Sequence, residues 1–363
     1  MKVGLVLGAG GVLGGAWLTG ALHALAQETD WDPGSSDFIV GTSAGSMIGA
    51  LTAAGVPPWF MVAHSAGESF EGVLAADGRP ASEADRAAGA SYRLHRGLPA
   101  IGPGSLRMAL TALSNPLRHT PLQVLAGWLP AGFVSTDSLK DTVRRAVPGE
   151  WVEHPNFWAV TCDYHSGRRV PLGRLDAPNA RIADAVAASC AIPGFYRPVK
   201  IGRRRYIDGG VCSASNLDLL AGRGLDLVIC LNPLSSGTEM DDGGSIPLDP
   251  RDWLGVVTRQ ANSRRLAHEA AKVRRFGTEV LLVEPTAPDQ RAMGHNLMSG
   301  ARRQQVIETA IHSVGEQLRH GRANELLADL PPGEPHKVRR PDGPPSTWPD
   351  LGPAVTAERA KAA

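Results

Sequence analysis

A serine flanked by glycines is the residue in this sequence best suited to covalent chemistry. Ser43 is the centre of a Gly-Thr-Ser-Ala-Gly sequence, which follows the apolar run 38–40 and precedes a helix-forming stretch. Strand, sharp turn and helix in this order are the context of a nucleophile elbow, in which Gly41 and Gly45 relieve crowding around a strained backbone. We predict that Ser43 is a nucleophile; the alternative is a Gly/Ser-rich turn that only begins a helix.

A serine nucleophile needs a base, and the chain offers two kinds of candidate. The first is Asp208, at the end of an expected strand, followed by Gly209 and Gly210, which permit a tight turn. The second is the histidine of a Ser-Asp-His triad, for which His268 and His295 come late enough in the sequence. The alternative for Asp208 is an Asx-turn without a chemical role.

A glycine-rich loop near the N-terminus is a third functional element. The run 2–7 is apolar enough for a buried strand, and the segment 8–15 contains five glycines before a helical stretch that extends to about Gln27. Such a loop exposes backbone N–H groups, which suit an anion. The anion is either the pyrophosphate of a dinucleotide or the oxyanion of an acyl-transfer intermediate.

The dinucleotide interpretation has partial support. Asp30 and Asp32 follow the loop at about the distance expected for a ribose contact. However, the third glycine position of the dinucleotide fingerprint holds Leu13, and a serine elbow on the next strand has no role in such a site. We therefore favour an oxyanion hole.

Composition narrows the class of protein. Of the 363 residues, 43% are hydrophobic and 20% are charged, which is ordinary for a globular protein with a sizeable core. The formal net charge of +1 argues against a nucleic-acid binder, and four widely spaced cysteines without a Cys-x-x-Cys pair argue against a zinc site. The uncharged run 3–22 is similar to a signal peptide, but its glycines favour strand, loop and helix. We expect a cytoplasmic protein with reduced cysteines.

The segment 57–136 differs in composition from the rest of the chain, and we expect it to be a helical insertion. From Arg86 to Thr136 there is no acidic residue, while arginines alternate with apolar residues and with glycine and proline. This pattern is typical of short, irregular helices. Two interpretations remain open: an insertion packed on the core with solvated arginines, or a lid over the active site that meets an anionic, apolar lipid surface.

Elsewhere strands and helices alternate, which predicts an α/β fold with a mainly parallel sheet between two layers of helices. Besides 2–7 and 38–40, the expected strands are 157–162, 169–172, 197–201, 204–207, 225–231 and 279–283, and the expected later helices are 181–190, 216–221, 253–276 and 297–319. We expect one domain, 1–320, and a flexible tail, 321–363, which is rich in proline, glycine and charge.

Four features in this order resemble the patatin-like phospholipases. They are the glycine-rich loop after the first strand, the sequence around Ser43, the Ala-Ser-Cys-Ala-Ile-Pro-Gly sequence at 188–194, and the Asp-Gly-Gly sequence at 208–210. An Asn-Leu pair at 216–217 also looks like the family. The resemblance covers about 2–231 and extends to the core near residue 319. The ordered set is far more specific than any single motif.

The resemblance implies a Ser-Asp dyad without histidine, in which Ser43 is the nucleophile and Asp208 is its base. It also implies that the backbone amides of Gly10 and Gly11 stabilise the oxyanion, with Gly8 supporting the same loop. The fold that it implies is a central sheet flanked by helices. The activity that it implies is hydrolysis of lipid acyl esters through an acyl-enzyme, without a metal or another cofactor.

The chain departs from the family at Leu13, near which the family usually has arginine or lysine. This departure supports an alternative, a catalytically weak lipid-binding or regulatory protein with the same fold. A dinucleotide-binding enzyme is the third hypothesis. For the hydrolase we expect a lipid or ester substrate, no nucleic-acid partner, and peripheral contact with a membrane surface through 86–136.

Overall fold

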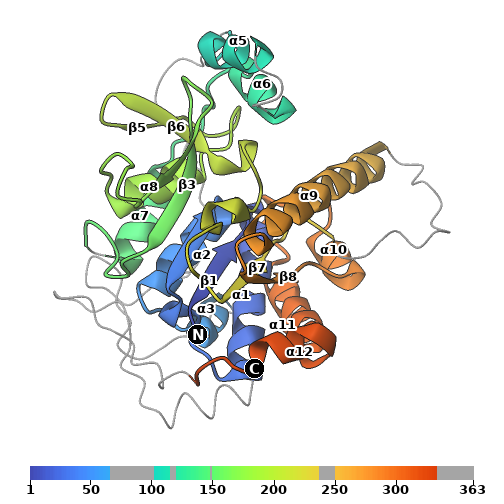
Figure 1. The fold of residues 1–363 in the computed structure, drawn as a ribbon. Helices are drawn as coiled ribbons and strands as arrows, with labels where there is room; N and C mark the ends of the chain where they lie inside the picture. Colours follow the sequence, from blue (N-terminus) through green and yellow to red (C-terminus); the bar gives the residue numbers. More distant parts are fainter. Residues whose placement is uncertain (66–101, 115–119, 148, 237–249, 333–363) are drawn as a thin grey trace, which may run out of the picture.

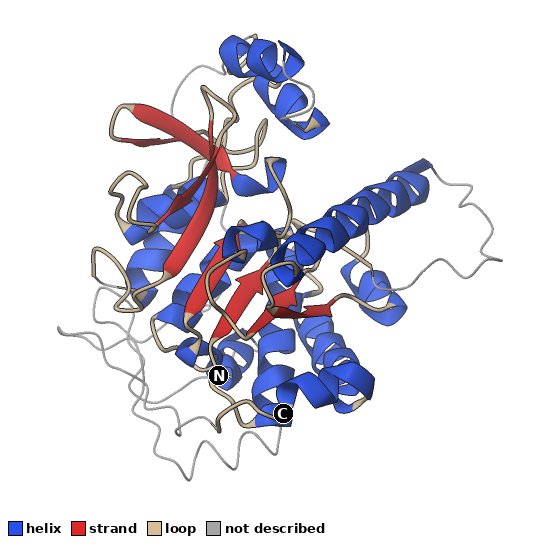
Figure 2. Ribbon diagram, in the orientation of Figure 1, coloured by secondary structure: helices blue, strands red, loops and turns tan. Residues whose placement is uncertain are grey.

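The computed structural model describes residues 1–65, 102–114, 120–147, 149–236 and 250–332. These residues form one mixed sheet with helices on both of its faces (Figures 1 and 2). The strand order is β5-β6-β3-β2-β1-β7-β8, and β4 pairs with β3 outside this path. The strands are β1 (Val3–Leu7), β2 (Phe38–Thr42), β3 (Phe157–Asp163), β4 (Arg169–Leu172), β5 (Val199–Ile201), β6 (Arg204–Asp208), β7 (Leu227–Leu231) and β8 (Glu279–Val283).

The centre of the sheet is parallel. β3, β2, β1, β7 and β8 all run in the same direction. β4 and β6 pair antiparallel with β3, and β5 is the hairpin partner of β6. The prediction of a mainly parallel sheet is therefore confirmed. β1 and β7 are buried along their whole length, as expected for apolar parallel strands that are covered on both faces.

Side chains alternate between the two faces of the sheet, and each face has its own hydrophobic core. Leu5 and Ile39 belong to the larger core, which α1, α2, α3, α8 and α11 cover, whereas Val6 and Val40 belong to a smaller core beneath α9. Among the described residues, no helix combines the length and the apolarity that crossing a bilayer requires. The helices are α1 (Gly11–Thr29), α2 (Ala44–Ala53), α3 (Pro58–Ser65), α5 (Leu106–Ser114), α6 (Pro121–Trp128), α7 (Asp137–Ala146), α8 (Ile182–Ser189), α9 (Pro250–Arg274), α10 (Ala287–Met293), α11 (Arg303–Arg319) and α12 (Gly321–Leu327).

The expected insertion begins later than residue 57. α3 belongs to the main fold, because its apolar run 59–63 is buried in the larger core and packs near α1. α5 and α6 are short helices, as predicted, and stand at one end of the molecule beyond the hairpin β5–β6 (Figure 1). Their inner sides form a third small core with the end of β3 and with β6. Residues 66–101 and 115–119 of the expected insertion lie outside the described residues.

The expected tail also begins later than residue 321. α12 continues the fold, and Leu327 and Leu330 are buried in the larger core. The apolar residues in this stretch are too few to show a helical period, which is why the sequence did not predict the helix. Residues 333–363 lie outside the described part of the chain.

Two other elements differ from expectation. The segment 216–221 is not an α-helix but a short 3₁₀ helix, Leu217–Leu220. The Leu217 N–H at its start donates to the Glu269 carboxylate on α9 (3.0 Å). The expected helix 297–319 begins only at Arg303, and α10 precedes it without having been predicted. A capping box formed by Thr286 and Asp289 starts α10.

Candidate active site

Ser43 occupies the turn between β2 and α2. Its backbone has φ 54° and ψ −123°, a conformation that costs an L-residue roughly 1–3 kcal/mol and that persists only where the surroundings require it. The side chain is buried, and the hydroxyl lies at the N-terminal end of α2. The predicted strand, turn and helix are confirmed, and the strained backbone is compatible with the predicted nucleophile elbow.

The two glycines of the elbow are required by close backbone approach. A Cβ at Gly41 would collide with the carbonyl oxygen of Gly45 and lie 2.5 Å from the Cα of Ser46. A Cβ at Gly45 would collide with the carbonyl group of Leu7 at the end of β1. Gly41 therefore lets the elbow fold on itself, while Gly45 lets α2 approach the neighbouring strand.

The register of the sheet brings Asp208 level with Ser43. Thr42 on β2 lies opposite Val160 on β3, and Asp208 at the end of β6 lies opposite Thr161. Since Ser43 follows Thr42 directly, Ser43 and Asp208 flank β3 at the same level. The Ser43 side chain lies near enough to the Asp208 carboxylate to lower the pKa of that carboxyl.

The Asp208 carboxylate is buried, and this sets its proton affinity. Burial raises the pKa of Asp208 to about 6, while hydrogen bonds from the Ser43 hydroxyl and from the Gly210 N–H act in the opposite direction. The Gly210 N–H lies 2.7 Å from Oδ1, so Asp208 also makes the Asx-turn that the Asp-Gly-Gly sequence predicts. A carboxyl with a pKa of about 6 is ionised at neutral pH and still basic enough to accept a proton.

The two candidate histidines are not partners of this pair. His268 on α9 and His295 after α10 are both exposed. Within the described part of the chain, the side chain of Asp208 has only Ser43 and Gly210 as hydrogen-bond partners. The geometry therefore brings together the serine and the aspartate, without a histidine between them.

The C-terminal end of α8 holds the backbone of both Ser43 and Asp208. The Ser43 N–H donates to Ser189 Oγ (2.9 Å), and Cys190 Sγ donates to the Ser43 carbonyl (3.2 Å). The Asp208 N–H donates to the carbonyl of Ala191 (3.0 Å). Burial raises the pKa of Cys190 to about 12, which keeps its thiol protonated as a donor. One short stretch, 189–191, thus positions both Ser43 and Asp208.

Replacing Ser189 by alanine is expected to lower kcat about tenfold with little change in KM, because the Ser43 N–H and the Val160 carbonyl, 2.7 Å from Ser189 Oγ, both lose their partner. Ser313→Ala is the matched control, since Ser313 is also a buried serine and donates to Asp289 far from the elbow. Both variants should lose roughly 1–3 kcal/mol of stability in urea unfolding. Equal kcat values for the two variants would contradict the positioning role.

The glycine-rich loop has free backbone N–H groups of the kind that an oxyanion hole requires. Four of its N–H groups hold the loop in shape by donating to backbone carbonyls; they belong to Gly8, Ala9, Leu13 and Gly14. Within the described residues, the N–H groups of Gly10, Gly11 and Val12 have no acceptor. Three free amides, which include the two predicted ones, therefore stand at the N-terminal end of α1, where backbone dipoles favour negative charge.

The same loop touches both halves of the candidate dyad. A Cβ at Gly45, next to the nucleophile, would lie 2.7 Å from the carbonyl oxygen of Gly8, and a Cβ at Gly210 would lie 3.6 Å from the Cβ of Ala9. The Ala9 N–H also donates to the carbonyl of Ala214 (2.8 Å), in the segment that follows Asp208. Three segments predicted separately from the sequence therefore converge at one edge of the sheet.

The two aspartates of the dinucleotide interpretation lie elsewhere. Asp30 follows α1, a helix of 19 residues that is about 28 Å long, so it lies at the end opposite to the glycine-rich loop. The Asp32 side chain accepts a hydrogen bond from the Gly34 N–H (2.8 Å) and caps a short turn there. Neither residue is placed to contact a ligand on the loop, and this geometry argues against a dinucleotide site.

Comparison with known proteins agrees with this geometry. Residues 5–221, more than half of the chain, match the sequence model of a family described as Patatin-like phospholipase. The chain belongs to the patatin-like phospholipase family. The matched region includes Ser43, Asp208, the glycine-rich loop and the end of α8.

Individual relatives match a shorter stretch of the chain than the family model does, and those compared come from mycobacteria. Proteins from Mycobacterium bovis and Mycobacterium tuberculosis, each named an uncharacterized NTE family protein, are 30% identical to this chain over 139 residues. The matched stretch is 37% of this chain and 36% of each relative. The chain thus spans about a third of the length of these relatives.

Leu13 occupies the position near which the family usually has a basic residue. Its side chain is buried in the larger core, so the surroundings of this position are apolar. A cation that the sequence did not single out lies nearby. Arg259 on α9 donates from Nη1 to the carbonyls of Pro233 (2.9 Å) and Ser235 (3.3 Å), and Pro233 packs against Gly10. Burial lowers the pKa of the Arg259 guanidinium, and no carboxylate of the described residues pairs with it. Nothing in the basic stretch 253–276 distinguishes this arginine from its neighbours.

A polar network beneath the elbow was also missed. Asn216, whose φ of 55° is tolerated by asparagine, donates from Nδ2 to Thr42 Oγ1 (3.0 Å), and Thr42 precedes the nucleophile. Arg169 on β4 donates to Asn216 Oδ1 (3.2 Å) and forms an ion pair with Asp218. The family resemblance had drawn attention to Asn216, but the contribution of β4 depends on strand pairing, which no local motif records.

Proposed function

We propose that this protein is a serine-dependent lipid acyl hydrolase that cleaves phospholipid or other long-chain esters through an acyl-enzyme. Ser43 is the nucleophile, Asp208 is its base, and the amides of Gly10 and Gly11 receive the oxyanion. The observation that carries the proposal is that the strained turn holds Ser43 level with the buried Asp208 carboxylate, on either side of β3. Membership of the patatin-like phospholipase family supports it independently.

The proposed reaction has two steps. Asp208 accepts the hydroxyl proton as Ser43 Oγ attacks the ester carbonyl, and the tetrahedral intermediate then expels the alcohol, which takes the proton from Asp208. Water next attacks the acyl-enzyme with Asp208 again as the base, so that the fatty acid leaves and the serine is restored. In both steps the carbonyl oxygen becomes negative where backbone N–H groups meet it. No metal or nucleotide takes part in these steps.

The proposal is tested by labelling the protein with a fluorophosphonate probe and by measuring turnover of short- and long-chain nitrophenyl esters. We expect covalent labelling, preference for long acyl chains, and undiminished activity in His268→Ala and His295→Ala. Loss of activity in a histidine variant would replace the dyad by a triad. Absence of labelling in the folded protein would favour the alternative of a lipid-binding protein without turnover, for which the buried Leu13 is the supporting observation.

The oxyanion role predicts a large effect at Gly11. Gly11→Val is expected to lower kcat about 10²- to 10³-fold, because a side chain at φ 62° would press on the Leu297 carbonyl and Met298 Sδ, at 3.0 and 3.1 Å, and displace the loop. Gly224→Val is the control, since Gly224 has a similar φ of 68° and open space around it. Gly10→Val should act in the same way as Gly11→Val. If the Gly11 variant matched the control in kcat, the loop would not be the oxyanion hole.

We further propose that residues 1–330 form the hydrolase unit, with α5 and α6 as its lid-like insertion. The burial of Leu327 and Leu330 supports this boundary. In this proposal the protein is cytoplasmic and contacts its lipid substrate at a membrane surface.

A further inference from the structure

Helices α5 and α6 carry an unusual concentration of exposed apolar side chains. The described chain has ten large apolar side chains that are exposed, and seven of these lie between residues 106 and 133. Each of the seven is 48–59% exposed, and together we call them the apolar face: Leu106, Leu110, Leu113, Leu122, Leu125, Trp128 and Phe133.

The two helices are apolar on both sides. On α5 the exposed leucines recur three and four residues apart, which places them on one side of the helix, while Met108 and Ala109 on the other side are buried. On α6 the exposed residues recur every three residues, and Ala126 is buried between them. A cluster of exposed apolar side chains usually marks a surface that contacts a partner or a lipid. The outward side of this pair is therefore a candidate interaction surface.

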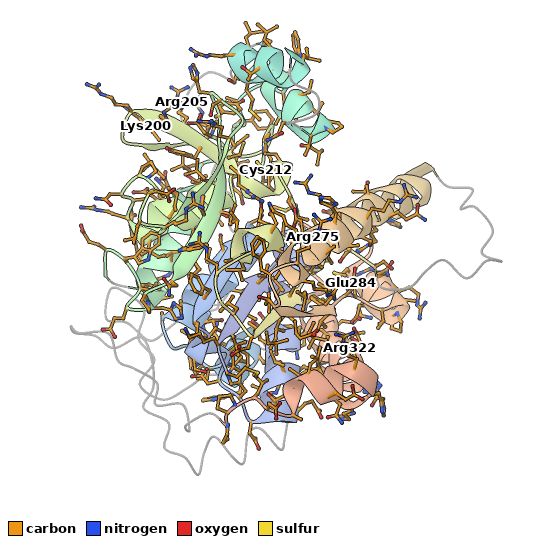
Figure 3. The ribbon with its side chains drawn as sticks, in the orientation of Figure 1. Lys200, Arg205, Cys212, Arg275, Glu284 and Arg322 are labelled. Atoms are coloured by element: carbon orange, nitrogen blue, oxygen red, sulfur yellow. The ribbon has the colours of Figure 1, made fainter. Side chains whose placement is uncertain are left out.

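Unpaired cations surround the apolar face. The segments 102–114 and 120–136 contain no acidic residue. Exposed cations without a carboxylate partner among the described residues occur on α5, after β3 and on the hairpin β5–β6, and we call them the basic rim: Arg107, Arg168, Lys200, Arg203 and Arg205. Figure 3 shows Lys200 and Arg205 on the hairpin at the same end of the molecule as α5 and α6.

The hairpin and the helix pair share one support. The Tyr164 N–H donates to the carbonyl of Arg205 on β6 of the hairpin (2.9 Å). The Tyr164 ring is in the same small core as Met108 and Ala126, and its hydroxyl lies against Gly104, just before α5. The basic rim and the apolar face are therefore parts of one surface.

We propose that the apolar face and the basic rim dock the protein on an anionic lipid bilayer. The leucines and aromatic rings enter the boundary between headgroups and acyl chains, and the cations of the rim bind anionic headgroups. This inference rests on the proposed function, because the bilayer supplies the ester that the active site cleaves. A second copy of the chain is a poor partner, since two basic rims would repel one another.

The docking surface adjoins the active site. Thr120, the N-cap of α6, donates from Oγ1 to the carbonyl of Val211 (2.6 Å), three residues after Asp208. Gln123 on the same helix donates to the carbonyl of Gly167 (2.7 Å) and to Cys212 Sγ (3.2 Å). The docked helices thus hold the Asp208 segment beside the lipid surface.

The test is co-sedimentation of the Ser43→Ala protein with sucrose-loaded vesicles, so that turnover does not alter the lipid. We expect binding to phosphatidylcholine vesicles that contain phosphatidylglycerol, and at least tenfold weaker binding to phosphatidylcholine alone. Two groups of substitutions should each lower the partition coefficient about tenfold or more: the apolar variant Leu106→Gln/Leu110→Gln/Leu122→Gln/Leu125→Gln and the charge variant Lys200→Gln/Arg203→Gln/Arg205→Gln.

Matched controls lie away from this surface. Leu175→Gln/Phe276→Gln removes exposed apolar side chains, and Arg264→Gln/Arg275→Gln/Arg291→Gln removes three exposed charges. We expect both controls to bind within twofold of the parent. Equal weakening by the controls, absence of binding to anionic vesicles, or an apolar variant that only converts a dimer into a monomer would overturn the proposal.

Failure of docking is separable from failure of the hydrolase. With Ser43 restored, the apolar and charge variants should keep turnover of a soluble short-chain ester within twofold and lose turnover of anionic vesicles. Short-chain turnover without vesicle binding would support the hydrolase proposal and contradict the docking proposal. Vesicle binding without any ester turnover would support the docking proposal and contradict the hydrolase proposal.

Discussion

Replacing Ser43 by alanine is expected to lower ester turnover by roughly 10⁴-fold or more and to abolish fluorophosphonate labelling, because the proposed acyl-enzyme forms on Ser43 Oγ. Ser36→Ala is the control for removing a buried hydroxyl, since Ser36 donates to the Pro33 carbonyl (2.7 Å) near the opposite end of the sheet. The control should keep full turnover. Labelling that persists in Ser43→Ala would move the nucleophile to another residue.

A glycine at the same position separates chemistry from strain. Ser43→Gly should be as inactive as Ser43→Ala, but we expect it to be more stable by about 1 kcal/mol, because glycine adopts φ 54° without the penalty of a Cβ. Urea unfolding of the two inactive variants measures this difference. Equal stability would mean that the elbow is not strained in solution.

Replacing Asp208 by asparagine is expected to lower kcat roughly 10³- to 10⁴-fold, since an amide cannot accept the proton of Ser43. In the parent protein, kcat/KM should rise with pH through about 6 and level off above it, because only the ionised carboxylate is a base. Turnover by the asparagine variant should lack this rise. A parent profile without a transition near pH 6 would argue against Asp208 as the base.

The same substitution should make the protein more stable at alkaline pH. The pKa of Asp208 is raised from 3.8 to about 6 in the folded protein, so the folded state binds this proton more tightly than the unfolded state does. Stability is therefore lost as pH rises from about 4 to 6, and the full cost, about 3 kcal/mol for about two pKa units, is present at pH 8. Asp208→Asn should recover an amount of that order in urea unfolding at pH 8 and much less at pH 4.

A second buried aspartate provides a control of opposite sign. Burial alone would raise the pKa of Asp163, but hydrogen bonds from the Ser166 N–H and from Arg204 outweigh it and hold the pKa below its usual value. Its charge therefore stabilises the fold above the unfolded pKa, and Asp163→Asn should lose stability at pH 8. A gain in both variants would show that asparagine stabilises these positions for reasons unrelated to charge.

The parts of the site that the sequence predicted are those with short-range causes. Gly41 is required by a turn within five residues, and the amides of Gly10 and Gly11 are free because a helix begins there. Gly45 belongs to the same local motif, although the contact that requires it is with the distant Leu7. Apolar runs predicted most strands, because parallel strands buried on both faces contain few polar residues. The role of Asp208 came from a family resemblance and agrees with the register of β3 and β6.

The parts that the sequence did not predict depend on contacts between distant segments. Arg259 resembles every other arginine of its helix until the fold places Pro233 between it and the glycine-rich loop. Ser189 looked like part of a helical motif, and its hydrogen bond to Ser43 exists only once α8 packs beneath the elbow. The sequence predicts a tail where α12 lies, because its few apolar residues show no helical period. Leu327 and Leu330 nevertheless bury this segment against the larger core.

The stretch 189–191 has a mechanical consequence. Because it holds Ser43 through a side chain and Asp208 through a carbonyl, the two residues share one support instead of two. If the proposed function is correct, we expect an acyl chain that presses on this support to displace both residues together. The distance for proton transfer would then be independent of the shape of the lipid that occupies the site.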